Sequence, residues 1–181
     1  MLEGMFVRAV VAHVFDRDNF DIDEVIGVQN IRLQDPVALG VLAAQRLGQE
    51  FATLAREAAV VVGRRNFGYG HPHVQSTTAL RQNGVVGIIA DSFTPAFWRG
   101  SMSAGFMLVA CPGIGDATRV KDTLEIDWAA SQVRIGRSSK TLTFHPHTDF
   151  EQRLQRAGGI VALLADEQNR MSAPAGQHHN V

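Results

Sequence analysis

The sequence predicts one α/β domain with a parallel core followed by antiparallel strands, and three observations indicate this fold. Between residues 59 and 111, short apolar segments alternate with segments of helical character, as in the βαβ units of a parallel sheet. After residue 113, short strand-like segments are separated by turn residues, which is typical of an antiparallel meander. The 181 residues, 45% of them hydrophobic, suffice for a single domain with a substantial core.

The N-terminal part of the chain is expected to contain two strands and a long helix. Residues 6–14 are rich in Val and Phe and predict a strand, and residues 25–33 predict a second, shorter one. Asp35 followed by Pro36 marks the start of a helix. An acidic N-cap accepts a hydrogen bond from a free backbone N–H of the first turn, and the N–H that proline lacks would have no partner at that position. Apolar residues at helical spacing continue this helix over residues 37–58.

The remaining elements follow in an order that alternates at first and then becomes a run of strands. The predicted strands of the parallel core are 59–62, 85–90 and 106–111, with helices at 75–83 and from 94 toward 105. The predicted antiparallel strands are 122–128, 132–137 and 140–144. A final helix is expected near Asp149, and the small polar residues 171–181 are expected to form a disordered tail, so that the domain spans residues 1–170.

Charge and cysteine content argue against several classes of protein. Lys plus Arg number 17 and Asp plus Glu 18, so the chain lacks the basic excess expected of a partner of nucleic acid or of an anionic membrane. No apolar run approaches the ~20 residues of a transmembrane helix, and residues 1–15 lack a secretory pattern, so a cytoplasmic protein is expected. The single cysteine, Cys111, rules out an internal disulfide, a cysteine-based zinc site and a self-contained iron–sulfur cluster.

The most informative segment is the loop at residues 63–73, between a predicted strand and a predicted helix. Its glycines are Gly63, Gly68 and Gly70. Such a loop lets a ligand approach the backbone, and the helix N-terminus offers unpaired N–H groups to an anion, with Arg64 and Arg65 adding positive charge. The residues predict a carboxylate or phosphate ligand near 66–77, and the alternative is a tight turn without a ligand.

The loop does not match two common phosphate-binding motifs. In a Walker loop, Lys and Ser or Thr would stand where this chain has Tyr69 and Gly70. In a dinucleotide fingerprint that starts at Gly68, the third glycine is replaced by His73. A nucleotide-binding function is therefore disfavoured.

Six segments carry a family resemblance by their order along residues 6–165. They are DNFDID at 18–23, VIG at 25–27 with the following Asn30-Ile31, NFGYG at 66–70, GIIADSF at 87–93, GF at 105–106 and the segment 149–164. Together they resemble the swivel domain of the aconitase superfamily. Among the members of that superfamily, the chain is most similar in size to the small subunit of 3-isopropylmalate dehydratase. The resemblance implies an aconitase-type swivelling β/β/α domain.

The resemblance also implies an activity and a partner. The chain would be the small subunit of a hydro-lyase that reversibly dehydrates a small hydroxy-dicarboxylic acid, in a role like that in leucine biosynthesis. A large subunit would carry the 4Fe-4S cluster as a Lewis acid for the departing hydroxyl, no cluster would be bound by this chain, and the enzyme would be active only as the heterodimer. The isolated chain could form a homo-oligomer.

The loop departs from the pattern of that family at its catalytic end. The family continues with Gly-Ser-Ser-Arg-Glu-His-Ala, in which a serine is the base and the arginine grips a carboxylate, whereas residues 70–76 here read GHPHVQS. One hypothesis is that His71 or His73 has taken over the proton transfer, because imidazole titrates near neutral pH. The alternative is a catalytically altered homologue that acts as a binding or assembly partner. The changed loop also leaves open whether the substrate is isopropylmalate or a related substituted malate.

Further substrate-binding residues are expected around this loop. They are Arg64, Asn66, Gly68 and Gly70 in the loop, and Arg32 after Asn30-Ile31. Arg32 would clamp the second carboxylate, and the alternative is a surface arginine. The His-Pro-His segments at 71–73 and 145–147 could chelate zinc, but they lie on elements that need not meet, so no metal site is assigned to them.

Overall fold

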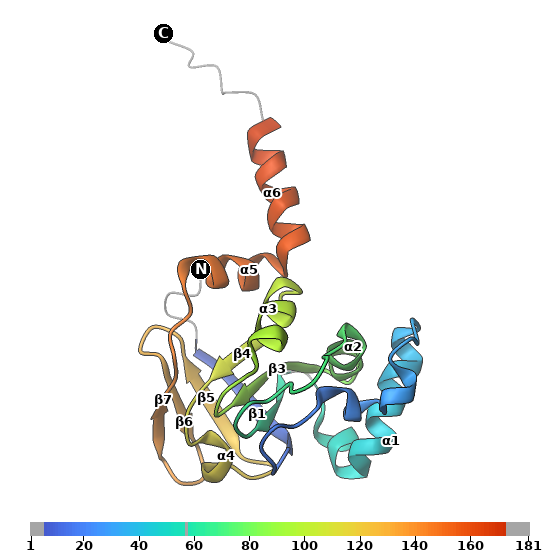
Figure 1. Cartoon of the computed structure of the whole chain (residues 1–181). Helices are drawn as coiled ribbons and strands as arrows, with labels where there is room; N and C mark the ends of the chain where they lie inside the picture. The colour runs from blue at the N-terminus through green and yellow to red at the C-terminus, as the bar shows by residue number, and fades with distance from the viewer. Residues whose placement is uncertain (1–5, 57, 173–181) are drawn as a thin grey trace.

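A mixed seven-stranded sheet lies at the centre of the structure, a computed structural model that describes residues 6–56 and 58–172 (Figure 1). The strands are β1 (Phe6–Val14), β2 (Ala59–Gly63), β3 (Val85–Ala90), β4 (Met107–Ala110), β5 (Thr123–Asp127), β6 (Gln132–Ile135) and β7 (Thr141–Thr143). Their order is β4-β3-β2-β1-β5-β6-β7. Strands β1 to β4 are parallel to one another, whereas β5 pairs antiparallel with β1, β6 with β5 and β7 with β6. The predicted parallel core followed by antiparallel strands is confirmed.

Burial along the strands follows from their place in the sheet. Every residue of β2 is buried, because this strand has neighbours on both sides and is covered on both faces. In β6, exposed and buried residues alternate, because only one face packs against the core. Adjacent β2 residues Val60 and Val61 belong to two different apolar clusters, which therefore lie on opposite faces of the sheet.

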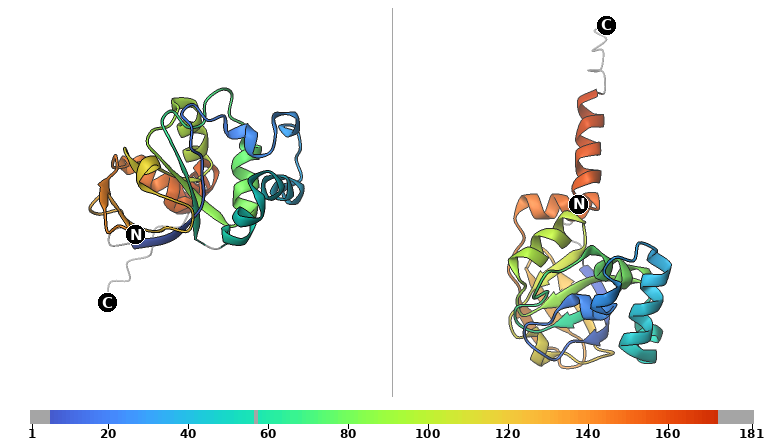
Figure 2. Two further views of the ribbon diagram at one scale, coloured as in Figure 1. Left: turned by 90° about the horizontal axis from the view of Figure 1, so that it is seen from below. Right: turned by 45° about the vertical axis from the view of Figure 1, so that its right-hand side comes forward.

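Helices complete the two sides of this core. They are α1 (Pro36–Leu54), α2 (Val74–Gln82), α3 (Pro95–Ser103), α4 (Ile114–Ala117), α5 (Asp149–Ala157) and α6 (Ile160–Ser172). Residues of α1, α2 and α3 contribute to the cluster around Val61, and the cluster around Val60 is closed by the curled strands β5 and β6. Figures 1 and 2 show α1 on one side of the parallel strands and β7 on the other, with α6 projecting from the body.

Side-chain caps determine where the helices begin. The carboxylate of Asp35 accepts from the N–H of Val37 at 3.0 Å, and the hydroxyl of Thr94 accepts from the N–H of Phe97 at 3.4 Å. Each cap satisfies an N–H group that has no partner within the helix. The predicted starts of α1 and α3 are thus confirmed, and α1 departs from helical geometry at Gly48.

The predicted strand at 25–33 is wrong. The chain forms two short 3-10 helices there, η1 (Ile22–Val25) and η2 (Val28–Asn30). The carboxylate of Asp21 caps η1 by accepting from the N–H of Asp23 at 3.0 Å, and the amide of Asn30 donates to the carbonyl of Ile26 at 2.8 Å. Such local bonds stabilise turns in competition with a sheet.

The C-terminal helical region contains two helices where one was predicted. Gly158 and Gly159 separate α5 from α6 with φ angles of +81° and +117°, which are accessible mainly to glycine. Residues 171 and 172 of the predicted tail lie in α6, and 173–181 lie outside the described residues. Within 6–56 and 58–172, none of the helices has the length and apolarity that crossing a bilayer requires.

Candidate functional site

The four parallel strands end at one edge of the sheet, and the segments with sequence motifs follow them there. Segment 15–23 follows β1, loop 64–73 follows β2, and segment 91–94 follows β3. Open α/β sheets bind ligands outside the carboxyl ends of their parallel strands. The topology therefore places the predicted loop at the edge where a binding site is expected.

Loop 64–73 lies along segment 15–23 and is bonded to it by side chains. The guanidinium of Arg65 donates to Oδ2 of Asp18 at 3.0 Å from Nε and 2.6 Å from Nη2. One position further, the amide of Asn66 donates to Oδ1 of Asn19 at 2.6 Å. These contacts join two motifs that are 47 residues apart in the sequence.

Gly68 is required by the close packing of this loop. Its N–H donates to the carbonyl of Phe20 at 3.0 Å, and its carbonyl accepts from the hydroxyl of Thr94 at 2.7 Å. Its φ is +77°, and an added Cβ would lie 2.6 Å from Cδ1 of Phe97 and nearer still to the Cβ and Cγ of that residue. Gly70 likewise has a φ of +86° and faces the carboxylate of Asp21. The two glycines serve the loop's shape, whatever ligand it binds.

His73 is the N-cap residue of α2, and a buried carboxylate holds its imidazole. Nδ1 of His73 lies 2.6 Å from Oδ2 of Asp23, a residue of η1 that is 4% exposed. Oδ1 of Asp23 accepts from the N–H of His73 at 3.1 Å and from the hydroxyl of Ser76 at 2.8 Å. Asp23 was visible in the sequence only as part of the motif at 18–23, because its partner lies 50 residues away.

The position of Asp23 also affects the predicted anion site at residues 66–77. Its carboxylate receives the N–H of His73 at the start of α2, where the helix dipole favours a negative charge. The N–H groups of Asn66 and Gly68 are likewise committed, to the hydroxyl of Ser92 and the carbonyl of Phe20. Much of the hydrogen-bonding capacity expected for a ligand is therefore used within the protein.

His71 differs from His73 in its surroundings. Its side chain is exposed, and within the described part of the chain its ring makes no hydrogen bond. His73 also lines a cavity of about 200 Å³ between α2 and α3, together with Pro72, Thr77, Phe97 and Ser101. The two candidate bases thus differ in how firmly the protein orients them.

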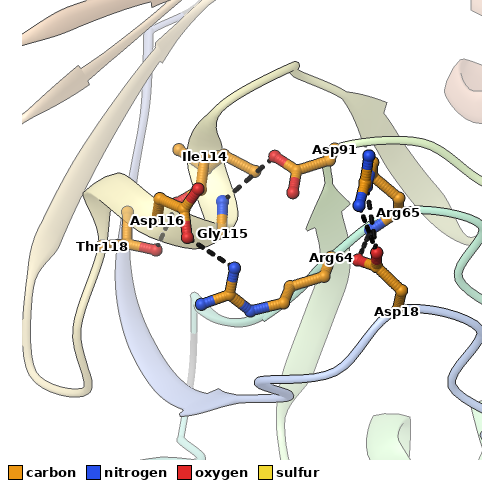
Figure 3. A network of polar contacts seen from close by, with 8 residues as sticks. All are labelled: Asp18, Arg64, Arg65, Asp91, Ile114, Gly115, Asp116 and Thr118. Atoms are coloured by element: carbon orange, nitrogen blue, oxygen red, sulfur yellow. Dashed lines mark hydrogen bonds and ion pairs between the residues drawn. The ribbon is translucent and has the colours of Figure 1, made fainter.

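A larger pocket of about 820 Å³ lies beyond the ends of the parallel strands and is lined by opposite charges (Figure 3). Its charged side chains are Asp16, Asp18, Arg64, Arg65, Asp91 and Asp116. Arg64 forms an ion pair with Asp116, and Arg65 with Asp18. The hydrogen bond from Arg65 lowers the pKa of Asp18, and the bond to Asp116 raises the pKa of Arg64. A carboxylate ligand in this pocket would compete with aspartates for both arginines.

The structure does not bring all the predicted substrate-binding residues together. Arg64 lines the charged pocket, whereas His73 lines the smaller cavity. Arg32 lies after η2 in an exposed position, and its guanidinium makes no ion pair or hydrogen bond with any residue that the structure describes. A common site would have to be completed by a further surface.

The two His-Pro-His segments have different environments. His145 lines the charged pocket, and His147 is buried with its ring centroid 5.4 Å from that of Trp98 and 5.0 Å from that of Trp128. Burial lowers the pKa of His147, so the ring is neutral at pH 7. Among the described residues, no cluster of three or more His, Cys, Asp or Glu side chains could hold a metal ion.

The side chains of this chain do not fit an iron–sulfur cluster. Such clusters are held by several cysteine thiolates, and the sequence has one cysteine. Cys111 is buried, and burial raises the pKa of its thiol to about 12, so it stays protonated at neutral pH. A cluster that took part in the reaction would need ligands from another chain.

Comparisons with known proteins agree on one group of relatives. The chain is 31% identical over 150 residues to the 3-isopropylmalate dehydratase small subunit 1 of Methanopyrus kandleri, covering 83% of this chain and 88% of that protein. It is 31% identical over 152 residues to the small subunit of Deinococcus deserti, covering 84% of each. The crystal structure of 3-isopropylmalate dehydratase from Methanocaldococcus jannaschii superimposes with a TM-score of 0.83 at 26% identity, over 94% of this chain and 100% of that one. No protein-family model matches the chain.

Proposed function

The chain belongs to the family of 3-isopropylmalate dehydratase small subunits, and on this basis we propose that it is the small subunit of a hydro-lyase for a small hydroxy-dicarboxylic acid. The family and the swivel-type α/β fold predicted from the motifs are confirmed. In the proposed enzyme, this chain acts in the cytoplasm and only together with a large subunit that carries a 4Fe-4S cluster. That cluster would supply Lewis acidity toward the departing hydroxyl.

The observation that supports catalysis is an imidazole held in place at the ligand-binding edge of the sheet. His73 is bonded to Asp23 and stays partly exposed, with 40% of its side chain accessible. In the proposed reaction, a neutral imidazole of His71 or His73 accepts the proton from the carbon next to a substrate carboxylate. The C–H electron pair becomes the carbon–carbon double bond as the C–O bond breaks, and the proton and hydroxide leave as one water molecule.

The same edge supplies charge for the substrate carboxylates. Arg64 and Arg65 line the charged pocket, and either guanidinium could exchange its aspartate for a substrate carboxylate. Arg32 is proposed as the ligand of the second carboxylate, with the loop at Asn66 and Gly70 shaping the site. The large subunit would cover this edge and complete the site.

The test is reconstitution with the large subunit encoded in the same genome, under anaerobic conditions. Dehydration of isopropylmalate and related substituted malates is followed by the ultraviolet absorbance of the enoate product. We expect turnover that falls by about 10²- to 10⁴-fold when the base is replaced by glutamine. Variants His71→Gln, His73→Gln and the double variant identify that base, and Arg134→Gln on β6, outside both pockets, is the control. Full activity in the double variant would show that neither His71 nor His73 is the base.

A binding or assembly role without turnover is the second candidate. It is favoured by GHPHVQS at 70–76 in place of the family's serine and arginine, and by the ion pairs that occupy Arg64 and Arg65. In that case the chain would co-purify with a large subunit, and the complex with an intact cluster would dehydrate none of the hydroxy diacids. Turnover dependent on His71 or His73 would exclude this role.

A further inference from the structure

We propose that Asp23 is a positioning residue that makes His73, rather than His71, the base, with Nε2 as the atom that accepts the proton. This assignment rests on the proposed function and deepens it. It is carried by three hydrogen bonds to one buried carboxylate, which orient the imidazole and determine where its proton lies.

The first step concerns the proton of the neutral imidazole. An ionised carboxylate can only accept hydrogen bonds, so the 2.6 Å contact between Oδ2 of Asp23 and Nδ1 of His73 requires the hydrogen on Nδ1. A neutral imidazole carries one such hydrogen, and Nε2 is then left with a lone pair. Because Nε2 lies across the ring from Nδ1, it is directed away from Asp23. The basic nitrogen of His73 is thus the one that is not bonded to Asp23, in a side chain that is 40% exposed.

The second step concerns how firmly Asp23 is held. Its own N–H donates to Oδ1 of Asp21 at 3.0 Å, and its neighbours Ile22 and Val25 in η1 are fully buried. Its Oδ1 is engaged by the N–H of His73 and by the hydroxyl of Ser76, so the carboxylate cannot rotate without breaking both bonds. A base supported in this way is held in one orientation before the substrate binds.

The third step separates the two histidines. Backbone and side chain of His73 are bonded to the same carboxylate, whereas the ring of His71 is exposed and has no hydrogen-bond partner among the described residues. An imidazole without a partner can carry its proton on either nitrogen. When His73 accepts the substrate proton, the imidazolium that forms faces the negative charge of Asp23, an arrangement that favours proton transfer. No comparable group is bonded to His71.

The tautomer can be measured on the full chain without the large subunit. The protein labelled with ¹⁵N-histidine is studied above pH 8, where an ordinary imidazole is neutral. Its seven histidines are resolved by long-range ¹H–¹⁵N correlation spectra, and the signals of His73 are identified by their loss in His73→Gln. We expect a protonated Nδ1 and an unprotonated Nε2 at His73. A proton on Nε2 of His73 in the wild-type chain would overturn the proposal.

The substitution Asp23→Asn inverts the expected result. Two donors, the N–H of His73 and the hydroxyl of Ser76, require the amide oxygen at the Oδ1 position, so the amide NH₂ faces Nδ1 of His73. Nδ1 must then accept, and the proton moves to Nε2, the atom proposed to be basic. We expect the His73 tautomer to switch in Asp23→Asn and to stay unchanged in Ser76→Ala, which removes one bond to the same carboxylate.

Activity of the reconstituted complex then tests the link to catalysis. If turnover is observed, Asp23→Asn is expected to lower kcat by about 10²-fold or more, with a smaller effect on KM. His73→Gln is expected to lower kcat far more than His71→Gln does, and Arg134→Gln on β6, outside both pockets, is the control expected to keep the kcat of the wild type. An unchanged kcat in Asp23→Asn with a switched tautomer would refute the assignment. A complex without turnover whose wild-type His73 has the expected tautomer would refute the proposed function but leave the Asp23–His73 geometry confirmed, so the two failures are distinguishable.

Discussion

Replacing Gly68 with alanine would introduce a methyl group where the loop packs against α3. The φ of Gly68 is +77°, a conformation that costs other residues roughly 1–2 kcal/mol. The new Cβ would lie 2.6 Å from Cδ1 of Phe97, well inside van der Waals contact. Phe97 is 3% exposed and has the rings of Phe67 and Phe93 within 5.9 and 6.1 Å, so it has little room to move.

The expected loss of stability combines these two effects. Overpacking of a close-packed core typically costs about 1–3 kcal/mol, so Gly68→Ala should lower the free energy of unfolding by about 2–5 kcal/mol in total. That is a large part of the roughly 5–15 kcal/mol that stabilises an ordinary domain. Gly113→Ala is the matched control, because Gly113 has a similar φ of +85° and nothing within 4 Å of its added Cβ.

Urea denaturation followed by circular dichroism compares the two variants with the wild type. Gly113→Ala should lose only the roughly 1–2 kcal/mol that the backbone conformation costs, and Gly68→Ala about 1–3 kcal/mol more. Equal losses in the two variants would refute the steric argument, since they would mean that Phe97 moves away without cost.

Three further predictions follow from buried groups. Burial raises the pKa of Cys111 to about 12, so a disulfide reagent at pH 8 should react with this thiol only after urea unfolds the protein, and rapid labelling of the folded chain would contradict this. Burial lowers the pKa of His147 and of His13 below the ordinary 6.5, so the unfolded chain binds more protons; stability should be full above about pH 6.5 and fall below it. Unfolding free energies measured between pH 7.5 and 5 check this, and His147→Phe should reduce the slope. Asp122→Ala should lower the free energy of unfolding by about 2–3 kcal/mol, because the buried carboxylate accepts hydrogen bonds from Nε of Arg137 at 2.8 Å and from a backbone N–H. Thermal unfolding measures this loss, and the control is Arg8→Gln, which removes an ion pair with an exposed arginine.

The candidate site could be predicted in part, because its residues lie in recognisable motifs. The glycine loop, the segment 18–23 and the histidines of the altered loop were all visible in the sequence, and the family to which they point is confirmed. Their roles stay predictions. Nothing in the local sequence showed that the N–H groups of Asn66 and Gly68 bond within the protein, because their partners belong to other segments.

The error at residues 25–33 has a related cause. A short mixed segment carries too weak a periodicity to separate a strand from a turn. In and just before this segment, the outcome depended on hydrogen bonds between side chains and backbone. The amide of Asn30 donates to the carbonyl of Ile26, and the N–H of Asp23 donates to the carboxylate of Asp21; the apolar pattern carries no signal of either bond.

The sequence alone determined the features that depend on neighbouring residues. The caps Asp35 and Thr94 start helices because each side chain bonds an N–H within three residues, and alternation of apolar segments predicts a parallel core because strands and helices have different periods. Only the tertiary structure decided which distant groups meet. Parallel pairing of β1 with β2 brings the segments that follow both strands together, and the buried carboxylate of Asp23 thereby meets the imidazole of His73. Hydrogen bonds act over about 3 Å, so contacts between residues far apart in the chain follow from how the sheet is assembled.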